Sequence, residues 1–306
     1  MAIGAFSHGP SGITTDAPAQ RSSRIAWLLL LPGILYLVLF FIVPLFSLVM
    51  TSFQEMVPGG FIGEYQNAFR WENYTEVLGM YGEHTLRSFL YAATATVIAL
   101  IIGYPLAYFI GVKLRRYPLL QSLALVLVIA PFFISFLLRT LAWKQILADE
   151  GFVIATMKTL QLLPDDAHIT GTAISVIFGL AYNFIPFMTL PLYTTLERLD
   201  LRLIEAGSDL YANPFTTFIK VTVPLTMPGI ISGTLLTFIP AAGDYVNASA
   251  NFLGSTSTAM IGNVIESNFL VLQNFPHAAS LSLILMSVIL VLVSAYVKKS
   301  GTEDLL

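Results

Sequence analysis

The stretch IAWLLLLPGILYLVLFFIVPLFSLVMTSFQ, residues 25–54, carries no charged side chain. A helix that crosses the hydrocarbon core of a bilayer needs roughly 20 mostly apolar residues, so this run is long enough for one span. Its continuous apolarity favours a helix over the alternating strands of a membrane barrel, because backbone groups in lipid must pair within the segment. The run therefore predicts a membrane protein.

Five further uncharged runs of comparable length follow along the chain. They cover residues 88–112, 117–138, 169–196, 221–243 and 278–297. Only 11% of the 306 residues are charged, against about 25% in ordinary soluble domains, which agrees with most of the chain lying in lipid. The six runs predict an all-α membrane protein with six transmembrane helices.

A seventh uncharged run, residues 245–265, is long enough to span a membrane but contains Asn247, Asn251 and Asn263. Unpaired polar groups are costly in lipid, so we expect a loop and short helices at the interface or among the other helices. Long outward connections are also expected near residues 54–86 and 140–168. Within the fifth run, Gly229 and Gly233 form a G-x-x-x-G pattern, which is typical of closely packed membrane helices.

The basic residues predict the orientation, because cytoplasmic loops of membrane proteins are enriched in Lys and Arg. Six spans place both termini on one side, and that side holds ten of the fifteen bases. These ten are Arg21, Arg24, Lys113, Arg115, Arg116, Arg198, Arg202, Lys220, Lys298 and Lys299. We therefore expect a multi-pass protein of the inner or plasma membrane with both termini in the cytoplasm. Residues 1–24 and 301–306 are then cytoplasmic tails, and residues 25–300 form the membrane domain.

The cytoplasmic connection of residues 197–222 has mixed charge and helical spacing. With the residues that follow, it reads ERLDLRLIEAGSDLYANPFTTFIKVTVP from Glu197 to Pro224. Asn213 followed by Pro214 is typical of an N-cap and the first position of a helix, so we expect two helices joined by a corner. Such an elbow suits a groove on another protein, and Ala206 and Gly207 would let a partner backbone come close. The alternative is an ordinary connecting loop with helical content.

At these residues the sequence resembles the cytoplasmic signature of ABC importer permeases: E-A-A, three residues, G, nine residues, then I-x-L-P. Glu205, Ala206 and Gly207 align with E-A-A, Tyr211 with the glycine, and Pro224 with the proline. The sequence departs from the signature at Gly207, which replaces the second alanine, and at Tyr211, which replaces the glycine. Further stretches resemble the spermidine/putrescine branch of these permeases; they are residues 187–193, 224–231 and 260–265.

The resemblance implies a type I ABC importer permease bundle with a cytoplasmic coupling elbow. It also implies four kinds of partner: a dimer of ATPase subunits, a second permease, an extracytoplasmic solute-binding protein and the lipid bilayer. The residues that would couple to the ATPase are Glu205, Ala206, Gly207, Asp209, Leu210, Tyr211, Ala212 and Pro224. The chain contains no G-x-x-x-x-G-K-[ST] phosphate loop, so ATP and Mg²⁺ are expected on the ATPase and no cofactor on this chain.

Ionisable and polar residues near the ends of spans are candidates for a solute pathway, because charge is costly in a membrane. Asp244 ends the fifth run beside Tyr245, whose ring suits a cation-π contact with an ammonium. The other candidates are Glu266, Tyr182 and Asn183. Each also has an ordinary role open to it: Asp244 as a helix cap, Glu266 as a solvated acid and Asn183 as a bond between helices.

The resulting hypothesis is a transport subunit, not an enzyme, that imports a polyamine with energy from a partner. A permease for another small solute, such as a phosphonate or ferric iron, remains an alternative. An ion-coupled secondary transporter is a third, although the spans show no convincing repeat and no central acid. The four histidines are scattered and the chain has no cysteine, so we expect no metal site, and nothing in the sequence indicates a nucleic-acid partner.

Overall fold

The computed structural model describes residues 23–299, so the expected tails lie outside the described residues except for Ser23 and Arg24, which begin the first helix. The chain divides into two units, Met1–Leu48 and Val49–Leu306. In the first unit, α1 (Ser23–Leu37) continues through a π-helical turn (Val38–Ile42) into α2 (Val43–Ser52), which crosses into the second unit. Together they form a 26-residue apolar helix, Trp27–Ser52, long enough to span a membrane.

The second unit is built on α3 (Glu72–Tyr108), which continues through a π-helical turn (Phe109–Lys113) and a 3₁₀ turn (Leu114–Arg116). The 45 helical residues Glu72–Arg116 extend over about 65 Å at 1.5 Å per residue. The expectation of a loop at residues 54–86 was therefore wrong from Glu72 onward. Arg87 and the charged residues before it bound the uncharged run, but they lie on a helix that projects beyond the apolar segment. The rest of the stretch holds two short antiparallel strands, β1 (Glu55–Met56) and β2 (Tyr65–Gln66).

Three helices form the centre of the bundle: α3, α7 (Ala173–Glu197) and α11 (Met227–Ala242), with α13 (Phe275–Lys299) packed against α3. Small residues let their backbones approach closely. A Cβ added at Gly229 would lie 2.5 Å from the Thr195 hydroxyl, and one added at Gly233 would lie 3.0 Å from the Met188 carbonyl. The G-x-x-x-G pattern therefore marks close packing of α11 on α7 inside this chain.

Two of the expected spans are bent. Helix α4 (Pro118–Ile129) and its 3₁₀ extension (Ala130–Phe133) meet α5 (Phe136–Leu147) and α6 (Phe152–Thr159) at 94°. The second bend, of 70°, separates the helical segment Pro214–Leu225 from α11. Within residues 23–299, four helices are long and apolar enough to cross a membrane, or six if each bent pair counts as one span.

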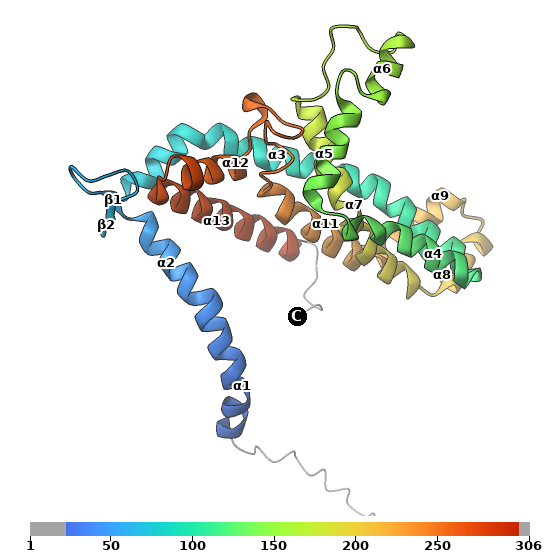
Figure 1. Ribbon diagram of the computed structural model, residues 1–306. Helices are drawn as coiled ribbons and strands as arrows, with labels where there is room; N and C mark the ends of the chain where they lie inside the picture. The colour runs from blue at the N-terminus through green and yellow to red at the C-terminus, as the bar shows by residue number, and fades with distance from the viewer. Residues whose placement is uncertain (1–22, 300–306) are drawn as a thin grey trace, which may run out of the picture. The chain divides into compact units, whose positions relative to one another are not determined.

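The stretch of residues 245–265 folds back into the bundle, as expected from its polar content. It contains a 3₁₀ turn (Thr256–Thr258) and α12 (Ile261–Glu266), followed by a π-helical turn (Ser267–Val271). Leu253 and Met260 are fully buried, and a Cβ on Gly179 of α7 would lie 2.4 Å from Leu253. We call residues 244–272 the outer loop. Figure 1 shows α12 toward one end of the bundle, with α8 (Leu201–Asp209) and α9 (Pro214–Thr217) at the other.

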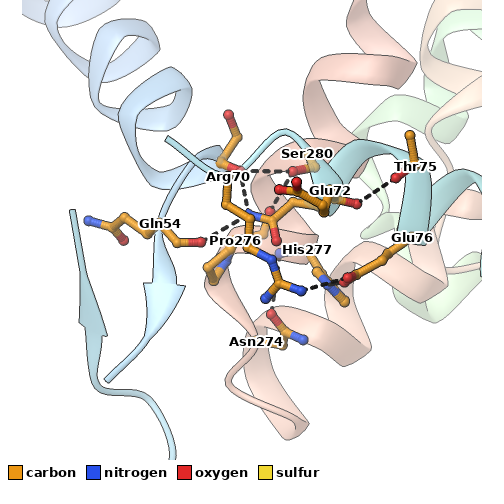
Figure 2. Close-up of polar contacts among 11 residues, drawn as sticks. Gln54, Arg70, Glu72, Thr75, Glu76, Asn274, Pro276, His277 and Ser280 are labelled. Carbon is orange, nitrogen blue, oxygen red and sulfur yellow. Dashed lines mark hydrogen bonds and ion pairs between the residues drawn. The ribbon is translucent and has the colours of Figure 1, made fainter. Parts of the chain in front are cut away.

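Polar contacts join the start of α3 to the start of α13 beside the hairpin (Figure 2). The Glu76 carboxylate accepts from the Arg70 guanidinium at 2.6 Å and contacts the His277 ring at 3.2 Å. Buried Asn73 donates to the carbonyls of Ser52 and Gln54, at 2.8 and 2.9 Å. Hydrogen bonds and ion pairs therefore hold the starts of α3 and α13 together at this end of the bundle.

Candidate functional site

The segment that follows α7 contains two short helices, α8 and α9, joined by a corner. We call residues 199–225 the elbow. The side chain of Asn213 accepts a hydrogen bond from the Thr216 N–H at 2.7 Å, and Pro214 occupies the first turn of α9. This local structure is the N-cap arrangement that the sequence predicts. The elbow is also tied to the turn after α3, because Arg115 donates to the Leu199 carbonyl at 2.9 Å.

The corner of the elbow is a helix-terminating Schellman turn centred on Tyr211. The Ala212 N–H donates to the Gly207 carbonyl at 3.1 Å, across Tyr211, which has a φ of 57°. Positive φ at this position is what favours glycine, since other residues in the left-handed region carry a cost of roughly 1 to 2 kcal/mol. The geometry gives a physical reason for a glycine at this position of the signature. It also shows that Tyr211 keeps the turn despite its side chain.

Gly207 does not face outward, which corrects the expectation that it keeps a contact face small for a partner. It is buried, and a Cβ added there would lie 2.8 Å from the Thr217 methyl group of α9. The small residue at position 207 therefore permits the two helices of the elbow to touch each other. Its neighbour Ala206 is exposed and remains available for contact.

The outward surface of the elbow is unusually apolar for a charged segment. Tyr211 is 99% exposed, Leu210 81% and Phe215 70%. Exposed apolar patches of this kind mark contact sites, because they gain free energy when another surface covers them. Exposed Glu205 lines a neighbouring groove of about 390 Å³ with Lys113 and Arg116, beside this patch. Asp209 and Pro224 are exposed, and Ala212 is half-buried.

The far end of α11 from the elbow leads into a buried polar network. Asp244 is 7% exposed, and its carboxylate accepts from the backbone and side-chain N–H groups of Asn247 at 2.8 and 3.1 Å. Burial raises the pKa of the Asp244 carboxyl to about 6, although the bonds from Asn247 act against the rise. The carboxylate organises the turn that begins the outer loop, and it does not cap a helix, because the next helical turn begins only at Thr256.

Asn247 joins Asp244 to α7 and α5. The Asn183 amide donates to the Asn247 side-chain oxygen at 3.1 Å and to the Thr140 hydroxyl at 3.2 Å. All four side chains are buried. The structure thus brings together Asp244 and Asn183, which lie 61 positions apart. Sequence reasoning missed Asn247 and Thr140 as links; the cluster of asparagines in the outer loop was the signal for the first of them.

Tyr182 lies in an aromatic cluster beside this network. Its ring centroid lies 5.1 Å from that of Trp143, and Phe178 stacks nearby. On the same helix as Trp143, Arg139 is only 8% exposed, and two of its guanidinium nitrogens have no hydrogen-bond partner.

Tyr245 is half exposed, and Glu266 lies apart from the network, on a separate cavity of the outer loop. No group of three potential metal-ligating side chains occurs within residues 23–299.

A family model described as the inner membrane component of binding-protein-dependent transport systems matches residues 103–299. The chain belongs to this family. It is 36% identical over 262 residues to the spermidine/putrescine transport system permease protein PotB of Haemophilus influenzae, covering 85% of this chain and 89% of the relative. It is 35% identical to PotB of Escherichia coli over 266 residues, covering 87% and 94%.

The fold of this permease is also found in a bacterial ABC transporter that imports the polysaccharide alginate. A chain of that crystal structure superposes with a TM-score of 0.66 over 91% of this chain and 96% of its own, at 15% identity. A second structure, in complex with a periplasmic protein bound to an alginate pentasaccharide, gives a TM-score of 0.64. The permease is therefore a multi-pass inner-membrane transport subunit whose bundle has the fold of an ABC importer permease.

Proposed function

We propose that this permease moves a polyamine, spermidine or putrescine, across the inner membrane as one subunit of an ATP-driven importer. Relatives that are 34 to 36% identical over most of the chain are named as spermidine/putrescine transport permeases. The structure of the elbow is the main support for the proposed mechanism. Its exposed apolar corner stands where the sequence resembles the E-A-A signature.

The elbow is proposed to receive motion from a dimer of ATPase subunits. Leu210, Tyr211 and Phe215 present their side chains to the ATPase, and Glu205 and Ala206 complete the contact. ATP and Mg²⁺ bind to the ATPase, and hydrolysis there moves the elbow. The energy enters this chain as a mechanical displacement and requires no nucleotide site of its own.

The bend before α11 offers a route for that displacement into the bundle. Thr226, which lies between the elbow and α11, is fully buried, and its hydroxyl contacts the Tyr104 hydroxyl of α3 at 2.6 Å. Beyond it, Gly229 and Gly233 hold α11 tightly against α7. Because this packing is close, displacement of the elbow is expected to shift α11 as a body and reach Asp244 at its other end.

The proposed topology has six spans, with each bent pair counted as one, and both termini in the cytoplasm. Ten of the fifteen bases then lie on the cytoplasmic side. The elbow lies on that side, and the outer loop faces an extracytoplasmic solute-binding protein. A second permease completes the pathway, for which Asp244, Tyr245, Tyr182, Asn183 and Glu266 are the candidates in this chain.

Transport by the reconstituted complex tests the proposal. The permease is co-purified with its second permease and ATPase subunits, placed in proteoliposomes, and supplied with its binding protein and radiolabelled spermidine. ATP-dependent uptake is expected, and a tenfold excess of unlabelled putrescine should compete. Uptake that persists without ATP would favour a secondary transporter. ATP-dependent uptake of a phosphonate or ferric iron, with none of a polyamine, would show that the solute is wrong.

A further inference from the structure

The outer loop and α3 line an open cavity beside the Asp244 network. It measures about 420 Å³, within the range of small-molecule sites, and lies between α3, the loop before α12 and the turn after it. Tyr81 contributes from α3, and Glu266, Ser267 and Asn268 from the opposite wall. The remaining wall comes from the outer loop and consists of Ala248, Ser249, Ala250, Ser255, Thr256, Ala259, Asn263, Val264 and Leu272. We call this the outer cavity.

The lining of the outer cavity favours a donor of hydrogen bonds with a positive charge. Glu266 supplies a carboxylate, and no lining residue among those that the structure describes is a lysine or arginine. Asn268 is 1% exposed, its amide nitrogen donates to the Val264 carbonyl at 2.9 Å, and its side-chain oxygen has no partner. A primary ammonium has three donors and no acceptor, so it complements the Glu266 carboxylate, and the Tyr81 ring offers a cation-π face.

One positive charge approaches the cavity from α3, and it is already compensated. Arg87 donates to the carbonyl of Ala259, a wall residue, at 3.1 Å, and forms an ion pair with Glu83 on its own helix. The guanidinium therefore holds the wall of the cavity in place while Glu83 neutralises its charge. The summed charge of Glu266, Glu83 and Arg87 is negative, and it would repel a phosphate or carboxylate ligand.

The position of the outer cavity suits a solute that arrives from outside. Tyr81 lies seven residues before Ser88, where the uncharged run begins, which corresponds to about 10 Å along the helix. The Ser88 hydroxyl accepts the Ile261 N–H at 2.7 Å, so α12 is fixed at the outer edge of the span. Ala248 lines the cavity and its N–H lies 3.4 Å from the Asp244 carboxylate, so the cavity adjoins the buried network directly.

We propose that the outer cavity is an entry site for one terminal ammonium of the polyamine, with Glu266 as its counter-ion and Tyr81 as a further contact. The inference rests on the proposed function and adds a binding step to it. The ammonium binds here after release from the binding protein and before it reaches the Asp244 network. Glu266 is thus a specificity residue for cations at the mouth of the pathway.

The test compares Glu266→Gln with Glu72→Gln in the complete transporter. Both substitutions remove one outer carboxylate and keep its shape, but Glu72 is exposed at the start of α3, nine residues from Tyr81. Loss of a charged contact of this kind is expected to raise the KM for spermidine uptake about tenfold while leaving the maximal rate within about twofold. Glu266→Lys should raise KM further, and Glu72→Gln should match the wild type.

Direct binding of radiolabelled spermidine to the detergent-solubilised permease complex, without the binding protein, supplies a second readout. Wild type and Glu72→Gln should bind, and Glu266→Gln should bind about tenfold more weakly. Unchanged KM and binding in both Glu266 variants, with normal ATP-driven uptake, would overturn the entry site and leave the proposed function intact. Absence of any polyamine uptake by the wild-type complex would instead overturn the proposed function.

Discussion

The elbow and the outer loop lie at opposite ends of α11 and are built in opposite ways. The corner of the elbow is made by contacts between near neighbours and its apolar side chains are exposed, although Arg115 also ties the elbow to the turn after α3. The outer loop is buried and polar, and partners more than 60 positions away in sequence hold it in place, such as Asn183 for Asn247 and Ser88 for Ile261. The contrast teaches that an exposed corner can be encoded locally, whereas a buried polar network depends on distant contacts.

The largest expected effect lies at the elbow. Ala206→Trp places a bulky ring on the exposed face proposed to contact the ATPase, so uptake and transport-stimulated ATP hydrolysis should fall at least 50-fold, roughly 2 to 3 kcal/mol of lost coupling. Membrane insertion should not change, since position 206 is exposed. Proteoliposome uptake and the amount of membrane-inserted protein measure the two effects. Glu205→Ala should act in the same direction, and normal uptake by both variants would contradict ATPase coupling through this face.

The outer loop should respond to substitution by losing its own structure. A Cβ at Gly254 would lie 2.0 Å from the Ala248 carbonyl, a backbone contact that cannot relax by rotation of a side chain. Gly254→Ala is therefore expected to destabilise the purified permease by about 3 kcal/mol, within the range of strained and overpacked sites. Thermal unfolding in detergent measures the loss. Gly79→Ala is the matched control, because nothing lies within 4 Å of a Cβ there, and it should be neutral or slightly stabilising.

Asp244 gives the outer loop a pH dependence. Its pKa is raised by burial from 3.8 to about 6, so the folded permease holds a proton that the unfolded chain releases. The contribution of this group to stability is complete below pH 4 and is lost as the pH rises through about 6. At about 1.4 kcal/mol per unit, the loss is about 2 to 3 kcal/mol.

Asp244→Asn removes the titrating group and keeps its size. The unfolding free energy of wild type and of Asp244→Asn is measured from pH 4 to pH 7.5. As the pH rises, the wild type should lose about 2 to 3 kcal/mol of stability relative to Asp244→Asn. A difference that stays constant over that range would show that Asp244 does not titrate there.

The smallest effect concerns the corner of the elbow. Tyr211→Gly relieves the positive φ and is expected to stabilise the turn by about 1 kcal/mol, but it removes the most exposed ring of the elbow. Tyr211→Asn tolerates the same backbone and also removes the ring. If the ring contacts the ATPase, both variants should lose a similar few-fold of uptake while differing in stability. Wild-type uptake in both would remove Tyr211 from the contact.

The second helix of the elbow could be predicted from sequence, because the residues that start it are near neighbours along the chain. Asn213 followed by Pro214 was enough to place the second helix, and both residues do what they predict. The expectation that Gly207 faces a partner protein was wrong. Gly207 packs against Thr217, which belongs to the other helix of the elbow. The beginning of α3 was missed because charged residues end an apolar run without ending a helix.

The candidate pathway could be predicted only in part. Asp244 and Asn183 were recognised as polar residues near membrane spans, but the bond that joins them passes through Asn247, whose partner cannot be read from its neighbours. Arg139 and Asn268 gave no sequence signal, because their significance lies in burial without a full set of partners.

The apolar runs, the helix start at Asn213 and Pro214 and the signature-like residues were determined by the sequence alone, since helix formation and helix capping depend on residues within one segment. The buried network and the outer cavity were decided by tertiary structure. Their walls come from α3, α5, α7 and the outer loop, and the polar groups of these elements acquire partners, or remain without them, only once the helices have packed.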